Sequence, residues 1–291
     1  FEVRVMEFFR GNSSSSSCEL RFFMTWIYTQ KAFGDREKLA VENLFKFHPD
    51  GCLVIASFSL DSANGMKALG PFVSRGLKVT AISPDFDYLF NNTPGSVWYR
   101  RLLHGGVNPG EIPLGQNLSN LLRLGFLYRF GGIYLDTDVI VLRSFQGLRN
   151  VIGAQTADAS TGNWSRLNTA VMVFDENHPL IFKFIQEFAL TFDGSKWGHN
   201  GPYLASRVVS RIGERAGYKN SFRVLSPAAF YPVDWSRIGR LFEGPKNSSH
   251  SEWLEAEMRR IRRRSFAVHL WNRESSGLQI QRGSIIQRII N

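Results

Sequence analysis

The chain has 291 residues, of which 43% are hydrophobic and 13% aromatic, and 35 Lys and Arg against 25 Asp and Glu give a net charge of +10. This composition excludes a disordered, collagenous or coiled-coil chain and is enough for one large domain with a real core. The basic balance favours anionic partners such as phosphates, nucleic acid or an acidic membrane face, without choosing among them. No stretch reaches the roughly 18 apolar residues that a membrane-spanning helix needs.

The first 17 residues are predicted to form a flexible stem or linker. Gly11 and Asn12 precede an unbroken serine run over 13–17, which cannot offset the entropy lost on its own ordering. The globular part is expected to begin near Cys18 and to form one domain over 18–291, since no later segment has a linker's composition. Because the sequence begins with Phe1, a signal or anchor upstream of it would not be visible.

The next elements alternate as they do in a parallel α/β sheet. The pattern predicts strands over 21–28, 52–58 and 77–82, with helices over 35–47 and 62–70 between them. Neighbouring parallel strands joined by one crossover begin at the same edge of a sheet, so we expect Cys18 and Cys52 to meet there as a disulfide. The alternative is a pair of buried free thiols.

The second half of the chain is predicted from shorter patterns. A wide apolar surface indicates a helix over 116–130, which Gly131 and Gly132 end, and IYLDTDVIVL (133–142) is predicted as a strand interrupted by two aspartates. The remaining elements are predicted as strands over 169–174, 222–225 and 266–271 and helices over 179–191, 201–212 and 250–264.

Asp136 and Asp138 carry the clearest chemical signal. Residues i and i+2 of a strand point the same way, and two like charges on one face of a buried strand are costly unless a cation offsets them. Carboxylate oxygens suit Mg²⁺ or Mn²⁺, and open α/β sheets bind ligands beyond the carboxyl ends of their strands. The alternative is a solvated turn, because a bare Asp-x-Asp is common.

The stretch YRFGGIYLDTDVIVL (128–142) resembles the Asp-x-Asp region of glycosyltransferase family 32. Four later stretches are similar to the α-1,4-glycosyltransferase (lactosylceramide 4-α-galactosyltransferase) branch of that family, and to its plant-type members most: NTAVMVFDENHP (168–179), WGHNGPYLASRV (197–208), PAAFYPVDW (227–235) and FAVHLWN (266–272). The similarity spans about residues 20–288 and the motifs occur in the family's order.

The resemblance implies a GT-A fold, with a Rossmann-like, mostly parallel central sheet flanked by helices. It implies a nucleotide-sugar-binding half over about 20–155 and an acceptor half over about 156–291. The implied enzyme is a retaining, Mn²⁺- or Mg²⁺-dependent transferase that moves a hexose, galactose as the first expectation, from a UDP-sugar to a glycan or glycolipid in α linkage. Alternatives are a donor carrying glucose, N-acetylglucosamine or mannose, a nucleotide-sugar hydrolase, and a non-catalytic glycan-binding relative.

By the same resemblance, Asp136 contacts the donor ribose and the cation, and Asp138 ligates the metal. His269 is implied as a third protein ligand, and imidazole with two carboxylates suits Mn²⁺. The alternative for His269 is a satisfied core histidine. Trp26 is implied to stack on the uracil of the donor, and its alternative is a core tryptophan.

The donor-sugar contacts are also implied by the family pattern. The family usually has Asp-x-x-Arg before the aspartate pair, and this chain has Asn120 and Arg123, which share a helix face. An amide lacks the charge that strengthens a carboxylate's hydrogen bonds to sugar hydroxyls, so the identity of the donor sugar is left open. For Arg123, the alternative is a side chain on a solvated helix face. The sugar is further implied to meet Asn168 and a loop, at the start of a helix, that contains His199, Asn200 and Gly201. The resemblance also implies catalytic roles for His199 and Asn200 of this loop, beside Asp136 and Asp138.

Two further expectations concern surroundings. The arginine run over 259–264 is interpreted as a solvated helix face, with attraction to anionic lipid headgroups or an acidic acceptor as the alternative. A nucleic-acid-binding protein would cluster aromatic and basic motifs on one element, which we do not find outside that run.

Five Asn-x-Ser/Thr sequons and the cysteine pair favour the secretory route. We therefore expect a lumenal catalytic domain of a single-pass type II Golgi membrane protein; glycans fit best at Asn91 and Asn163, the other sequons being at Asn12, Asn117 and Asn247.

Overall fold

The computed structural model describes residues 1–11, 18–27, 32–212, 218 and 220–290. Its elements in chain order are α1 (Glu2–Arg10), β1 (Arg21–Thr25), α2 (Asp35–Phe47), β2 (Cys52–Ala56), η1 (Gly65–Ala68), α3 (Gly70–Val73), β3 (Lys78–Ile82), α4 (Phe86–Phe90), α5 (Pro94–Leu103), α6 (Leu114–Phe130), β4 (Gly132–Leu135), β5 (Val139–Val141), β6 (Val151–Ala157), β7 (Trp164–Phe174), α7 (Pro179–Thr191), α8 (Pro202–Ile212), β8 (Arg223–Leu225), η2 (Pro227–Ala229), η3 (Ile238–Leu241), α9 (Ser248–Arg264), β9 (Ala267–His269), α10 (Asn272–Ser275) and α11 (Ile285–Ile290).

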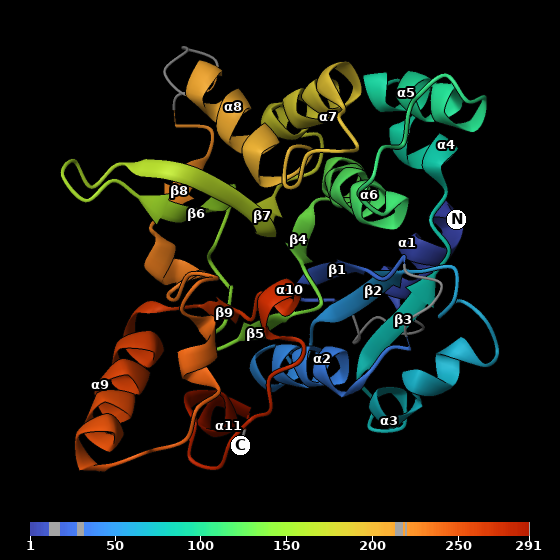
Figure 1. The fold of residues 1–291 in the computed structure, drawn as a ribbon. Helices are drawn as coiled ribbons and strands as arrows, with labels where there is room; N and C mark the ends of the chain where they lie inside the picture. The colour runs from blue at the N-terminus through green and yellow to red at the C-terminus, as the bar shows by residue number, and fades with distance from the viewer. Residues whose placement is uncertain (12–17, 28–31, 213–217, 219, 291) are drawn as a thin grey trace.

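The described strands form two sheets. The large sheet has the order β3-β2-β1-β4-β7-β6-β8, and the small one pairs β5 with β9. Strands β3, β2, β1 and β4 are parallel, whereas β7 runs antiparallel to both β4 and β6. The sheet is thus mostly parallel with helices packed against it, as predicted, and Figure 1 shows α5–α8 gathered on one side and α2 and α3 on the other.

The alternation of side chains along β1 explains these layers. Phe23 stacks on Phe126 of α6, with ring centroids 4.9 Å apart. Its neighbours Phe22 and Met24 belong to the apolar cluster on the opposite face, with Leu44 of α2. Each strand residue therefore faces one helical layer or the other, because successive side chains of a strand point to opposite faces. A third cluster gathers α9, α11 and the small sheet, at the C-terminal end of the molecule in Figure 1.

The N-terminal segment corrects the flexible-stem prediction. Residues 2–10 form α1, and Val5 and Phe9 on one face of this helix are 0% and 3% exposed. Phe9 packs edge-on against Phe23, with centroids 5.6 Å apart. The prediction was driven by the serine run, but the residues before it carry an amphipathic pattern that buries apolar surface against the sheet. The run itself lies outside the described residues.

The predicted disulfide is confirmed. Cys18 and Cys52 are bonded, with their Cα atoms 5.5 Å apart. Cys52 opens β2 and pairs in register with Arg21 at the start of β1. The two cysteines therefore meet because β1 and β2 are parallel neighbours that begin at the same edge of the sheet.

The aspartate-containing segment is not one strand, as the sequence had suggested. β4 ends at Leu135 in the large sheet, and β5 begins at Val139 in the small sheet. The backbone turns between them, with the Val139 N–H donating to the Asp136 carbonyl at 3.1 Å. Both aspartates therefore lie on the link by which the chain passes from one sheet to the other.

Other predictions match the structure in part. The helices expected over 35–47 and 179–191 have those bounds, but 62–70 contains only the 3₁₀ turn η1 and the start of the short helix α3. The sequence reasoning missed one strand, β6, and several helices, namely α1, α4, α5, α10 and α11. Among the described residues, no helix combines the length and apolar character that crossing a bilayer requires.

Candidate active site

Three potential metal ligands converge where the two sheets meet. Asp136 and Asp138 come from the link between β4 and β5, and His269 ends β9, where it pairs with Val139. One ligand atom from each side chain lies within 4.8 Å of the others. The proximity that was predicted from strand periodicity is thus present, but the turn and the pairing of β5 with β9 produce it.

Asp138 and His269 form a buried pair. Asp138 Oδ1 lies 3.1 Å from His269 Nε2, and the two side chains are 11% and 9% exposed. Asp138 Oδ2 accepts the backbone N–H of Asn272 at 2.8 Å. Burial alone would raise the pKa of Asp138, but His269 and these hydrogen bonds hold that pKa below its ordinary value. Burial likewise acts to lower the His269 pKa, but the Asp138 carboxylate raises it above the ordinary value.

Asp136 is held from the other side of the site. The Arg123 Nη2 of α6 lies 3.0 Å from Asp136 Oδ1, and the Tyr134 hydroxyl donates to the same oxygen at 2.7 Å. Although burial opposes the charge of Arg123, Asp136 raises the pKa of this guanidinium. Each of the two carboxylates therefore has its own cationic partner, which offsets the cost of placing like charges together.

The donor set fits a hard divalent cation. Two carboxylates and an imidazole are a ligand combination that suits Mn²⁺, and oxygen ligands also suit Mg²⁺. Within the described part of the chain, the buried His269 Nδ1 has no hydrogen-bond partner. This nitrogen belongs to the same imidazole ring whose Nε2 lies 3.1 Å from Asp138 Oδ1, and a buried polar atom without a partner is a group that a bound ligand or water would satisfy.

Arg123 is not on a solvated face of its helix. Its guanidinium is buried and donates to the Thr169 carbonyl at 2.8 Å as well as contacting Asp136. It therefore joins α6, β7 and the acidic link. Its predicted contact with a donor sugar stays a prediction.

Asn120 and Gly201, two residues predicted to border the donor sugar, lie against one another. A Cβ added at Gly201 would stand 2.6 Å from Asn120 Oδ1, so a larger residue here would displace the Asn120 side chain. The predicted start of a helix at this loop is confirmed by α8, which begins at Pro202.

His199 and Asn200 are engaged within their own loop. The Asn200 side chain is 2% exposed; it donates to Asn117 Oδ1 at 2.9 Å and to the Asp193 carbonyl at 2.8 Å. His199 Nε2 lies 2.8 Å from the Thr191 carbonyl. In this structure the hydrogen bonds of both side chains hold the loop in place. The catalytic roles predicted for His199 and Asn200 stay predictions.

The last two predicted residues are buried. Asn168 donates to Gln155 Oε1 at 3.0 Å and accepts the Ala170 N–H at 2.9 Å, so its amide stabilises β6 and β7. Trp26 is 6% exposed and packs edge-on against Phe33, with centroids 5.5 Å apart. Its stacking on a base also stays a prediction, and it would require the indole to become accessible.

Comparison with known proteins identifies the family. Residues 34–158 match the glycosyltransferase sugar-binding region containing the DXD motif, and residues 173–291 match the alpha 1,4-glycosyltransferase conserved region. The lactosylceramide 4-alpha-galactosyltransferase of Pongo pygmaeus is 32% identical over 203 residues, which are 68% of this chain and 84% of that protein. The chain belongs to glycosyltransferase family 32, in its α-1,4-glycosyltransferase branch.

Two further relatives are longer than this chain. The Rattus norvegicus lactosylceramide 4-alpha-galactosyltransferase is 31% identical over 250 residues, covering 83% of this chain and 64% of the relative. A protein of Arabidopsis thaliana, At4g19900, is 29% identical over 281 residues, covering 94% and 42%. The chain thus spans less than two thirds of the length of these two relatives.

The GT-A fold expected of a family 32 member is confirmed. The apo-form glycosyltransferase GlyE of Streptococcus pneumoniae TIGR4 has a TM-score of 0.50 with this chain and is 11% identical to it. The match covers 94% of this chain and 59% of GlyE. At this identity the likeness shows the fold alone.

Sequence reasoning on this family 32 member missed three residues of the site. Tyr134 could have been found, because it stands two residues before Asp136 on a predicted strand and so shares its side. Thr25 could not, because its approach to Tyr134 depends on the pairing of β1 with β4, in which Phe23 lies opposite Tyr134. The Asn272 N–H reaches Asp138 because the chain reverses at Trp271, whose φ is 54°.

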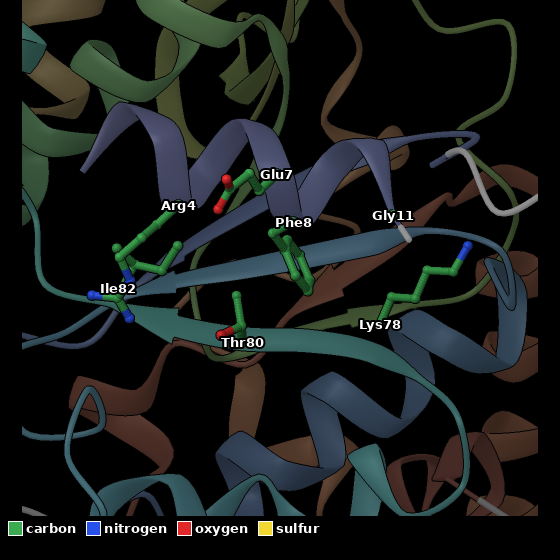
Figure 2. A pocket seen from close by; sticks show the side chains of 7 residues that line it. All are labelled: Arg4, Glu7, Phe8, Gly11, Lys78, Thr80 and Ile82. Carbon is green, nitrogen blue, oxygen red and sulfur yellow. The ribbon is translucent and has the colours of Figure 1, made fainter. Parts of the chain in front are cut away.

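A separate hollow lies at the edge of the large sheet, between α1 and the edge strand β3 (Figure 2). Its volume is about 460 Å³, and its lining includes Arg4, Phe8, Lys78 and Thr80. None of the predicted site residues lines it. The acidic site at the junction of the sheets is therefore the better candidate for chemistry.

Proposed function

We propose that this chain is a retaining glycosyltransferase that moves a hexose from a UDP-sugar to a glycan or glycolipid acceptor in α linkage, with a divalent cation. The single observation that carries the proposal is the convergence of Asp136, Asp138 and His269 at the junction of the sheets. Family membership and the names of the similar galactosyltransferases support galactose as the first donor to test.

The residues of the site fall into those that would bind the cation and those that hold its carboxylate ligands in place. Asp136, Asp138 and His269 would hold Mn²⁺ or Mg²⁺, which supplies Lewis-acid stabilisation of the diphosphate leaving group. His269 would bind the ion as a neutral imidazole, so binding would displace the proton that it holds beside Asp138. Arg123 and Tyr134 fix the Asp136 carboxylate, and the Asn272 N–H fixes Asp138. Held in this way, the two carboxylates need little reorganisation when charge develops on the leaving group.

The donor sugar is the least determined part of the proposal. Asn120 replaces the aspartate usual in the family, and its side chain lies against Gly201 of the predicted sugar-binding loop. We infer that this amide borders the donor sugar, so donors with glucose, N-acetylglucosamine or mannose belong in the same test. An amide accepts fewer hydrogen bonds than a carboxylate, which would change the choice among sugar hydroxyls.

The setting of the enzyme is proposed as the Golgi lumen. The Cys18–Cys52 disulfide and the exposed sequons at Asn91 and Asn163 support an oxidising, glycosylating compartment. Attachment to the membrane by a type II anchor stays a prediction.

A donor screen tests the proposal. Purified protein is incubated with each UDP-sugar and with GDP-mannose, with Mn²⁺ or with EDTA, and released nucleotide is measured. We expect release from at least one donor only with the metal, and none from Asp138→Ala at any metal concentration. Asn120→Asp should change the ranking of donors. Equal release by wild type and Asp138→Ala would refute the proposed reaction, and an unchanged ranking would remove Asn120 from the sugar site.

A further inference from the structure

A row of three hydroxyl groups, two of them buried, ends on Asp136. The Tyr134 hydroxyl lies 2.7 Å from Asp136 Oδ1 and 2.8 Å from Thr25 Oγ1. Thr25 Oγ1 in turn contacts the Ser119 hydroxyl of α6. Tyr134 is 0% exposed and Thr25 is 8% exposed. Three elements, α6, β1 and β4, therefore each contribute one hydroxyl to a continuous chain, which is half-buried at Ser119 and buried at Thr25 and Tyr134.

The chemistry of the groups fixes the direction of this chain. A carboxylate only accepts, so the Tyr134 hydroxyl donates its hydrogen to Asp136. Each hydroxyl has a single hydrogen, so Tyr134 accepts from Thr25, and Thr25 accepts from Ser119. All three hydrogens point toward Asp136, and hydrogen bonds aligned in this way strengthen one another.

Arg123 closes the chain into a ring. Its Nη2 lies 3.0 Å from Asp136 Oδ1 and 3.5 Å from Ser119 Oγ, and its Nε donates to the Ser119 carbonyl at 3.3 Å. The guanidinium carbon also lies 4.6 Å from the centre of the Tyr134 ring. The short contacts of the Asp136 carboxylate are thus made by Oδ1, whereas Oδ2 has a longer contact of 3.5 Å with Arg123 Nη1.

We propose that Tyr134 and Thr25, together with Ser119, are positioning residues for the cation site: they fix the Asp136 carboxylate through Oδ1 and so reserve Oδ2 as the metal-binding oxygen. The inference rests on the proposed function, because it assigns a task at that cation site to residues other than its three predicted ligands. Terminal torsions of aspartate are broad, so without these bonds the carboxylate would sample other orientations. Groups that orient a metal ligand in this way are worth about 10–100-fold in metal affinity.

A purely structural role for the hydroxyls predicts something different. Removing one hydroxyl leaves its neighbour buried and unpaired, which costs about 1–3 kcal/mol, whereas replacing both partners by apolar groups of the same shape is nearly neutral. The double variant Thr25→Val/Tyr134→Phe is therefore no less stable than the single variants. If the hydroxyl groups only stabilise the fold, the double variant should regain metal affinity together with stability. If they position Asp136, the metal affinity of the double variant should stay low.

The test measures Mn²⁺ binding and stability on the same proteins. Free Mn²⁺ is followed by its electron paramagnetic resonance signal, with Mn²⁺ alone and with Mn²⁺ plus UDP, and the free energy of unfolding is measured with urea in EDTA. The variants are Tyr134→Phe, Thr25→Val, their double variant and the conservative Thr25→Ser. Tyr231→Phe is the control, because Tyr231 is also buried and its ring packs against His269, with centroids 5.9 Å apart, but its hydroxyl accepts the Val171 N–H at 3.1 Å.

We expect Tyr134→Phe to weaken Mn²⁺ binding about 10–100-fold and Thr25→Val to weaken it less. The double variant should bind as weakly as Tyr134→Phe, whereas Thr25→Ser and Tyr231→Phe should bind like wild type. The inference is overturned if Tyr134→Phe binds Mn²⁺ as tightly as Tyr231→Phe, or if affinity follows the free energy of unfolding across the set. Wild type that binds no Mn²⁺ under either condition would overturn the proposed function as well, so the two failures are distinguishable.

Discussion

The buried pair of Asp138 and His269 gives a pH-dependent prediction for the metal-free protein. The His269 pKa is raised, so the stability that its charge contributes is complete below its ordinary pKa of 6.5 and is lost as pH rises through the raised value. The Asp138 pKa is lowered, so its contribution is complete above 3.8 and is lost as pH falls through the lowered value. The pair therefore contributes fully between these two ordinary values.

The substitution Asp138→Asn removes one charge and keeps the shape of the side chain. Breaking a buried ion pair costs about 3–5 kcal/mol, because the remaining charge is left without a partner. Above the raised pKa of His269 the imidazole is neutral, and only a hydrogen bond of about 1 kcal/mol is at stake. We therefore expect the loss of unfolding free energy to be several-fold larger near pH 6 than at a pH above that raised pKa.

Urea titrations in EDTA at both pH values measure this difference. Asp234→Asn is the control: Asp234 also has a lowered pKa, but its partner is Arg237, 2.5 Å away, which keeps its charge throughout this range. The cost of the control substitution should be the same at both pH values. An equal cost of Asp138→Asn at both pH values would refute the assignment of a titrating buried pair.

Three further outcomes follow from contacts elsewhere. Replacing both Cys18 and Cys52 by Ser should lower the free energy of unfolding by about 4 kcal/mol, from a separation of 34 residues, as measured by urea titration; a negligible change would contradict the closed loop. In a eukaryotic host, mass spectrometry should find glycan at the exposed Asn163 and none at Asn117, which is 3% exposed and accepts a hydrogen bond from Asn200. Asn200→Ala leaves buried partners unpaired and should cost about 1–3 kcal/mol by the same titration, and wild-type stability would show that the loop is not braced through it.

The sequence was informative about the first strands of the large sheet and about the disulfide. The alternation of strands and helices before residue 83 gave the parallel half of the sheet, and it also gave the disulfide, because the position of Cys18 and Cys52 in that alternation implies one sheet edge. The chemistry of Asp136 and Asp138 was likewise visible, since two acids in an apolar segment require compensation.

Long-range pairing decided what the sequence did not show. The turn that carries Asp136 and Asp138 exists because the chain passes from β4 in the large sheet to β5, which pairs with β9 in the small sheet. β9 lies more than a hundred residues later in the chain. The burial of Arg123 follows from its contact with Thr169, and the role of Thr25 depends on β1 lying beside β4. α1 was missed because the serine run that follows it dominated the composition of the segment.

The central claim is that Asp136, Asp138 and His269 hold a divalent cation for a nucleotide sugar. Crystals grown with Mn²⁺ and UDP, measured at a wavelength at which manganese scatters anomalously, test it most directly. The account predicts one strong anomalous peak within bonding distance of all three side chains, with the UDP diphosphate beside it. A map with UDP bound and no peak among these side chains would contradict the claim.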